Sequence, residues 1–372
     1  MTDQRERLVA DMMGWAVPDL AVTLPPAGQG PLIGTEWEQL TDAAVSDRIA
    51  GLLWKAIENG MAVTPLQRIG AATMAHDSMR AVVELEATAQ WVIGELESAG
   101  IDVRLIKGLA TAHAVHEDVR MRDSGDIDLL VLPRDLERSA EVLRGLGLRP
   151  STRWGDGANS FTKELVFVSE THIEIDLHQS LNFGARWRRL TPRLMADGMV
   201  VDSGDEPGPR FCTLNLEGLF VNAAISACRS DGRISGLLDV AAISHDPRLE
   251  PDRLLQLLDA EHLAPAVAPV LDKASRYFVI GQVAHDAVGA ARHTRRGVAC
   301  ARLEASETGA RYLYSCLSGS PRQWIPGLRA LARPDDAHFA GVSADQRVRI
   351  SRLATQSRSL LRSVPMRHGR SS

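Results

Sequence analysis

The chain has 372 residues, of which 45% are hydrophobic, 24% are charged and 5% are aromatic. This length and apolar fraction exclude a wholly disordered chain and provide enough apolar surface for a large buried core. The 42 basic and 47 acidic residues give a formal net charge of −5, which excludes a nucleic-acid binder that depends on bulk positive charge.

Residues 1–100 are predicted to form an N-terminal helical region. Apolar residues recur at three- and four-residue steps from Ala71 to Ala99, which predicts one long amphipathic helix that Gly100 ends. The segment from Trp37 to Asn59 is typical of two shorter helices, with a break near residues 42–46.

Residues 101–190 have a different pattern, which predicts a core of short strands and helices. Runs of branched apolar residues predict strands at residues 101–106, 127–132, 164–169 and 172–177. Residues 109–117 and 133–145 are typical of helices, and the polar, glycine-containing residues 151–159 indicate a loop. This alternation over a short stretch predicts a small mixed sheet.

Helical periodicity returns after a proline- and glycine-containing link at residues 202–209. Residues 214–227, 235–243, 251–258 and 262–278 predict helices within a C-terminal helical region that spans residues 210–300. Residues 301–372 lose this periodicity and end in an arginine-rich tail, which we expect to be irregular and flexible. The predicted fold is therefore α+β, with a small mixed-sheet core embedded between an N-terminal and a C-terminal helical region.

Two carboxylates lie close together in the run RDSGDIDLLV, which extends from Arg122 to Val131. Side chains alternate between the two faces of a strand, so Asp126 and Asp128 point to the same face, roughly 7 Å apart along the chain. Two adjacent carboxylates repel each other unless a cation lies between them. Oxygen ligands of this kind suit Mg²⁺, and a pair of such ions suits phosphoryl transfer.

The run THIEIDLHQSL repeats this arrangement on a later predicted strand. Glu174, Asp176 and His178 share one face there, and one of the two acids completes a three-carboxylate cluster if the strands are neighbours. A turn at Lys107 and Gly108 joins a predicted strand to a predicted helix. It offers a cradle for a phosphate, because the free amides of a helix N-terminus bind anions.

These residues resemble a known family. LIKG at residues 105–108, RDSGDIDLLV at residues 122–131 and DLH at residues 176–178 fit the patterns L-x-K-G, R-x-x-x-D-[IV]-D-[LI]-[LV]-V and D-L-H, in that order. This is similar to bacterial proteins described as uncharacterised nucleotidyltransferases, within the DNA polymerase β-like nucleotidyltransferase superfamily. The resemblance extends over about residues 1–280 and includes the run LLDVAAI at residues 237–243.

The resemblance implies which residues perform catalysis. Asp126 and Asp128 would hold two Mg²⁺ ions, with Mn²⁺ as the alternative ion. Asp176 would be the third carboxylate, which binds the catalytic ion and assists deprotonation of the acceptor hydroxyl. Glu174 stays an alternative to Asp176 for this position.

The resemblance also implies a set of residues around the nucleotide. Lys107 and Gly108 would contact the phosphates of an NTP. Arg122 would steady a phosphate or the carboxylate strand, and His178 would support a carboxylate or pack as a polar residue. The chain has Lys-Gly where many members of the superfamily have Gly-Ser, which leaves the grip on the phosphates open, and Gln179 where close relatives often have tryptophan.

The predicted function is Mg²⁺-dependent transfer of a nucleoside monophosphate from an NTP to an acceptor hydroxyl, with release of pyrophosphate. The expected acceptor is a small molecule, or a peptide or protein, because the family includes members found beside peptide-modification genes. One alternative is a non-catalytic nucleotide-binding or scaffold protein of a biosynthetic pathway. Another is a tRNA-modifying nucleotidyltransferase that binds RNA through the arginine-rich tail.

The cellular setting is predicted from what the chain lacks. Its N-terminus has no apolar run typical of a signal peptide, and no uninterrupted apolar segment is as long as a membrane span. The four cysteines are widely spaced, as is usual for reduced thiols of a protein core. We therefore expect a cytoplasmic protein without a membrane partner.

Overall fold

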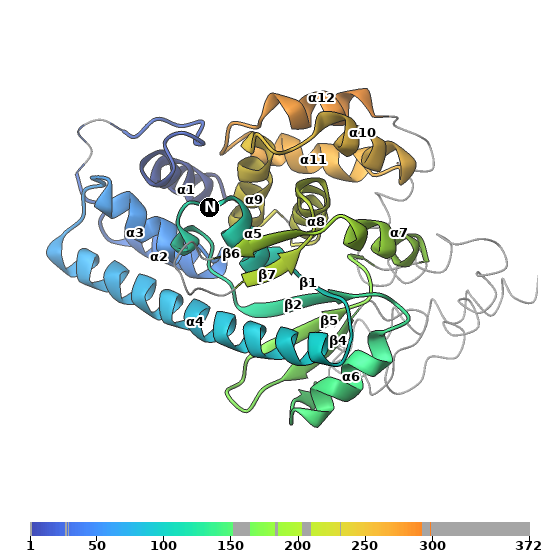
Figure 1. The fold of residues 1–372 in the computed structure, drawn as a ribbon. Coiled ribbons are helices and arrows are strands. Elements are labelled where there is room, and N and C mark those ends of the chain that lie inside the picture. The colour runs from blue at the N-terminus through green and yellow to red at the C-terminus, as the bar shows by residue number, and fades with distance from the viewer. Residues whose placement is uncertain are drawn as a thin grey trace, which may run out of the picture.

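The computed structural model describes residues 2–291 other than 27, 29, 152–163, 183–184, 203–209 and 231, and also residue 298. Within these residues, twelve α-helices and one 3₁₀ helix accompany a seven-stranded mixed sheet (Figure 1). This architecture confirms the predicted α+β fold. Nearly all of the loop expected at residues 151–159, and the tail expected at residues 301–372, lie outside the described residues. The proposed division of the chain into regions stays a prediction.

Four helices precede the first strand of the sheet, and five follow the last. The helices are α1 (Thr2–Ala16), α2 (Thr35–Ser46), α3 (Ala50–Glu58), α4 (Pro65–Ser98), α5 (Lys107–Val115), η1 (Val119–Met121), α6 (Leu136–Gly145), α7 (Ala185–Ala196), α8 (Leu216–Arg229), α9 (Ile234–His245), α10 (Pro251–Ala260), α11 (Ala264–Ala274) and α12 (Gln282–Ala290). The strands are β1 (Val103–Ile106), β2 (Asp126–Val131), β3 (Arg149–Pro150), β4 (Glu164–Val168), β5 (Glu174–His178), β6 (Met199–Asp202) and β7 (Arg210–Thr213).

The sheet has the strand order β3-β4-β5-β2-β1-β7-β6. Strand β2 pairs in parallel with β5, and β1 pairs in parallel with β7, whereas the other neighbouring strands are antiparallel. Asp128 of β2 lies opposite Asp176 of β5 on one side and opposite Ile106, the last residue of β1, on the other. This register places Asp128 between the second acidic strand and the start of α5.

Helix α4 confirms the long helix predicted for residues 71–99 and begins earlier, at Pro65. Thr64 and Gln67 form a reciprocal capping box, and proline at the first helical position favours a helix start. Gly100, with a φ of +71°, takes the left-handed conformation that ends the helix. The helix crosses the sheet and contacts β1 and β2 (Figure 1).

The predicted break between the two shorter N-terminal helices is misplaced. Residues 42–46 continue α2, because Ala43 and Ala44 are completely buried and packing holds this turn in the helix. The break comes at residues 47–49 instead, where Arg48 has a φ of +54°. Its position matters because Arg48 donates a hydrogen bond to Asp126 at the start of β2.

Three elements near residue 200 were not predicted from the sequence, namely α7 and the strands β6 and β7. The two strands form an antiparallel hairpin on either side of the expected link, most of which lies outside the described residues. Each strand has only four residues, and Val200 is exposed, so neither has a strong apolar pattern. The hydroxyl of Thr213 donates to the Leu105 carbonyl at 2.6 Å and ties β7 to β1.

The four helices predicted after residue 214 are confirmed as α8 to α11, and α12 follows them. They lie together on one side of the molecule (Figure 1), where α8 and α9 contact α5. Burial is nearly complete along α8 and α9, which explains why their sequences are apolar on more than one face. This packing brings the two helices over the start of α5.

No helix among the described residues is both long and apolar enough to cross a membrane. Cys212 and Cys228 form no disulfide within the described residues, and both are half-buried rather than fully buried as expected. Cys300 and Cys316 lie outside the described residues.

Candidate active site

The two acidic strands lie side by side and present their carboxylates on the same face. Asp128 and Asp176 occupy paired positions on the parallel strands β2 and β5. The alternate residues Ile127 and Ile175 point to the opposite face and are completely buried. The alternation of acidic and apolar residues in each strand therefore holds the two carboxylates against each other.

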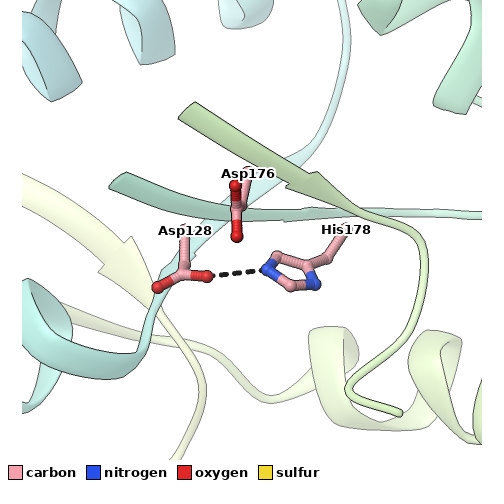
Figure 2. Close-up of side chains that lie close together, drawn as sticks. All are labelled: Asp128, Asp176 and His178. Atoms are coloured by element: carbon pink, nitrogen blue, oxygen red, sulfur yellow. Dashed lines mark hydrogen bonds and ion pairs between the residues drawn. The ribbon is translucent and has the colours of Figure 1, made fainter. Parts of the chain in front are cut away.

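His178 completes a compact cluster with these two carboxylates. One ligand atom from each of Asp128, Asp176 and His178 lies within 4.8 Å of the others, and Figure 2 shows the three side chains converging. The Nε2 atom of His178 lies 2.7 Å from Asp128 Oδ1, and its Nδ1 atom lies 3.0 Å from Glu164 Oε2. The imidazole is fully buried, and carboxylates on two sides fix its orientation.

Lys107, the first residue of α5, places its ammonium group in this cluster. The ammonium forms an ion pair with Asp128 and lies 3.3 Å from His178 Nε2. Burial alone would lower the pKa of Lys107, but the negative charges of Asp128 and Glu164 raise it above its usual value. The side chain therefore stays charged. Its backbone has a φ of +57°, which lies in the left-handed region that favours glycine.

The cluster contains more carboxylate groups than positive charges, since Lys107 provides one ammonium group. Burial, the largest cause, and the charges of Asp128 and Glu164 together raise the pKa of Asp176 to about 8. A divalent cation would remove the repulsion that holds the proton on Asp176. Two carboxylates suit Mg²⁺ or Mn²⁺, and an imidazole nitrogen favours a transition metal over Mg²⁺. The donor set therefore fits a divalent ion.

Asp126 lies outside the cluster, although it is on the same strand face as Asp128. Its Oδ1 atom accepts a hydrogen bond of 3.1 Å from Arg48, and its side chain is 32% exposed. The guanidinium of Arg48 lies against Gly125, where a Cβ atom would approach it to 2.7–3.0 Å. Glu174 stands opposite Asp126 and also lies outside the cluster. The structure thus brings together two of the three predicted metal ligands and adds His178.

Arg122 belongs to a buried ion pair at the edge of the site. Its Nε atom lies 2.9 Å and 3.1 Å from the two carboxylate oxygens of Asp239, and His116 Nε2 lies 3.2 Å from the same carboxylate. Arg122 also donates to the Asp123 carbonyl at 2.5 Å, and the Asp123 carboxylate accepts from the Ala50 amide at 2.9 Å. Arg122 thereby ties the loop before β2 to α9, while Asp123 ties it to α3.

We expect Asp239→Asn to lower the free energy of unfolding by about 3 kcal/mol, because Arg122 would be buried without its carboxylate. Burial alone would raise the pKa of Asp239, but Arg122 and His116 hold it below its usual value. This stabilisation is therefore present at neutral pH and is lost as the pH falls through the lowered pKa. Urea unfolding at pH 7 measures the effect. Replacement of the exposed Asp42 by asparagine is the control and should change the free energy of unfolding by less than about 0.5 kcal/mol. An Asp239→Asn variant as stable as the wild type would contradict this role.

A cleft with a cavity volume of about 280 Å³ lies between the start of α5, the strand β2 and the helices α8 and α9. This volume is near the lower end of the range for small-molecule sites. Positive side chains outnumber negative ones along its wall, where the basic residues are Arg48, Lys107, Arg122, Arg229 and Arg233 and the acidic residues are Asp126, Asp128 and Asp239. The cleft is therefore suited to an anionic ligand.

Four residues of the site were not identified from the sequence. Arg48 and Arg233 come from helical regions far from the motifs, and no local pattern marks them. Glu164 begins its strand in register with His178, a pairing that appears only when β4 and β5 are neighbours. Ser124 lies in the run RDSGDIDLLV. The two small residues before Asp126, Ser124 and Gly125, are a sequence signal of close packing.

Comparison with known proteins identifies the family. Residues 34–279 match a family described as uncharacterised nucleotidyltransferase. A solved structure of an antigenic nucleotidyltransferase-like protein from Paracoccidioides brasiliensis is similar at 15% identity and a TM-score of 0.37, covering 58% of this chain and 97% of that chain. No curated protein matches the chain. Because the family match spans more than half of the sequence and agrees with the resemblance of its motifs, the chain belongs to the uncharacterised nucleotidyltransferase family.

Proposed function

We propose that the protein is a Mg²⁺-dependent nucleotidyltransferase that moves a nucleoside monophosphate from an NTP to an acceptor hydroxyl and releases pyrophosphate. The observation that supports it most is the facing pair Asp128 and Asp176, joined by His178, at the start of a helix that borders a basic cleft. The expected acceptor is a small molecule, or a peptide or protein. Mn²⁺ is the alternative ion, and ATP is one of the candidate NTPs.

Asp128, Asp176 and His178 would hold the catalytic ion in this proposal. Asp126 would hold the second ion, for which its carboxylate must exchange the bond with Arg48. The ions, when bound, neutralise the charge of the phosphates and polarise the bond that breaks. Lys107 would then be available as a counter-charge for the phosphates, because the ions would take its place beside Asp128.

A side chain of the protein accepts the proton that the acceptor hydroxyl loses. Asp176 accepts the proton of the acceptor hydroxyl, for which a bound cation must first remove the repulsion that holds a proton on this carboxylate in the metal-free site. The acceptor oxygen forms a bond to the α-phosphorus, and the bond from that phosphorus to the bridging oxygen of the β-phosphate breaks. The bond electrons leave with pyrophosphate, so atoms and charge balance.

Arg233 supports a phosphate-binding role for the opposite wall of the cleft. Its side chain makes no hydrogen bond or ion pair with the residues that the structure describes. Burial lowers its pKa, and the neighbouring charges of Arg48 and Arg122 lower it further. A bound polyphosphate would relieve this repulsion between guanidinium groups.

The direct test is transfer of label from α-labelled NTPs. We expect the purified protein with Mg²⁺ or Mn²⁺ to label a component of a cell extract, and the kind of component identifies the acceptor class. Asp128→Asn is the matched inactive control, because it keeps the shape of the side chain and removes its charge. Nucleotide binding by calorimetry without any labelling would favour the scaffold alternative. Absence of both binding and labelling would contradict the proposal.

Two further expectations stay predictions. Label on tRNA would favour the RNA alternative, in which the arginine-rich tail takes part. The cytoplasmic location would be checked by fractionation of cells that produce the full chain.

A further inference from the structure

The first turn of α5 approaches the loop before β2 at Gly108. A Cβ atom built on Gly108 would overlap the hydroxyl oxygen of Ser124 and lie 3.3 Å from its Cβ atom. The hydroxyl of Ser124 therefore fills the space that a side chain at residue 108 would occupy. Any larger residue at position 108 would displace it.

The hydroxyl of Ser124 has no hydrogen-bond partner among the described residues, although the residue is only 8% exposed. A buried hydroxyl without a partner is costly, by about 1–3 kcal/mol, and needs an explanation. Ser124 lines the basic cleft together with Lys107 and Gly108. A ligand in the cleft is therefore the partner that fits its position.

Two other groups of donors face the same place. Helix α5 has Ile106 at its N-cap position and receives no side-chain cap, so its first amides are available to an anion. The Nη2 atom of Arg122 lies 3.7 Å from the Cβ position of Gly108. The Nε and Nη1 atoms of Arg122 bind Asp239 and the Asp123 carbonyl, which leaves Nη2 without a described partner. The Ser124 hydroxyl, the first amides of α5 and the guanidinium of Arg122 thus converge beside Gly108.

We propose that Ser124 is a phosphate-binding residue, whose hydroxyl donates to an oxygen of the NTP polyphosphate seated on the N-terminus of α5. The proposal rests on the nucleotidyltransferase function proposed above and identifies the hydroxyl that grips the nucleotide. Gly108 is then required for its lack of a side chain, which leaves room for both Ser124 and the phosphate.

The test compares Ser124→Ala with the wild type for binding of ATP and of inorganic tripolyphosphate in the presence of Mg²⁺, by calorimetry. We expect Kd to rise by about 10- to 100-fold for both ligands, as for loss of a hydrogen bond to a charged group. The melting temperature without ligand should be unchanged or higher, because the variant removes an unsatisfied buried hydroxyl. A serine that only packs in the loop would leave both Kd values unchanged, and that result would overturn the proposal.

The matched control is Ser139→Ala in α6. Ser139 is also buried, but its hydroxyl donates to the Asp135 carbonyl at 2.7 Å. We expect this variant to melt earlier and to bind both ligands as the wild type does. The two serine variants should therefore show opposite patterns of stability and binding.

A second variant tests the complementary space. Gly108→Ser combined with Ser124→Gly moves the hydroxyl from one residue to the other. We expect it to bind tripolyphosphate at least about 5-fold more tightly than Ser124→Gly alone, which is about 1 kcal/mol. Equal binding by these two variants would contradict the exchange. Failure of the wild type to bind either ligand would instead contradict the proposed function itself.

Discussion

Asp176→Asn is expected to abolish nucleotidyl transfer and, without metal, to make the protein more stable above pH 8. The activity should fall by at least about a thousandfold, or ~4 kcal/mol, because in the proposed mechanism this carboxylate holds the catalytic ion and accepts the proton. Glu174→Gln on the same strand face is the control and should keep its activity, since Glu174 lies outside the cluster. This comparison decides between the two acids for the third carboxylate.

The gain in stability follows from the direction of the pKa shift. The pKa of Asp176 rises from its usual 3.8 to about 8 in the folded protein. The stabilisation that the protonated group provides is complete below pH 3.8 and is lost as the pH rises to about 8. Asparagine cannot ionise, so the variant should exceed the wild type by about 2 kcal/mol at pH 9 in urea unfolding with EDTA. A variant that transfers label at the wild-type rate, or that loses stability at pH 9, would contradict this account.

Lys107→Met is expected to lower the free energy of unfolding by about 3 kcal/mol at pH 8 without metal, because Asp128 would lose its buried counter-charge. Methionine retains much of the apolar stem, so the change removes mainly the ammonium group. Addition of Mn²⁺ or Mg²⁺ should restore most of the lost stability, since a divalent ion can take the place of the ammonium beside Asp128. Urea unfolding with EDTA and with each ion measures both effects.

Lys55→Met on α3 is the matched control for this experiment. Lys55 makes no ion pair within the described part of the chain, so its replacement should change stability by less than about 0.5 kcal/mol with or without metal. The same unfolding curve for wild type and Lys107→Met in EDTA would show that the ammonium does not balance the cluster. A loss of stability that neither ion reverses would show that the cluster does not bind them.

Much of the fold can be predicted from patterns among residues that are close together in the sequence. The 3.6-residue stripe of α4 and its capping residues predict a helix whatever it packs against. The misplaced break in the N-terminal helices shows that local patterns do not always predict where a helix ends. Asp42 and Ser46 are residue types that favour turns, but burial of Ala43 and Ala44 keeps the helix intact. The hairpin of β6 and β7 was missed because its strands are stabilised by pairing with each other and with β1 rather than by their own pattern.

The sequence by itself determined which acidic side chains share a strand face. Alternation along a strand has a period of two residues, so Asp126 and Asp128 must share a face, as must Asp176 and His178. The motifs around them also determined the family, which the match over residues 34–279 confirms. These conclusions depend only on neighbours in the chain.

Only the tertiary structure decided which of these groups meet. The parallel register of β2 and β5 selects Asp128 rather than Asp126 as the partner of Asp176, and a shift of one residue would have turned the faces apart. Arg48 reaches Asp126 from 78 residues away, and Ser124 fills the space beside Gly108. Contacts of this kind depend on how segments that are far apart in the sequence pack together, and local periodicity carries no information about that packing.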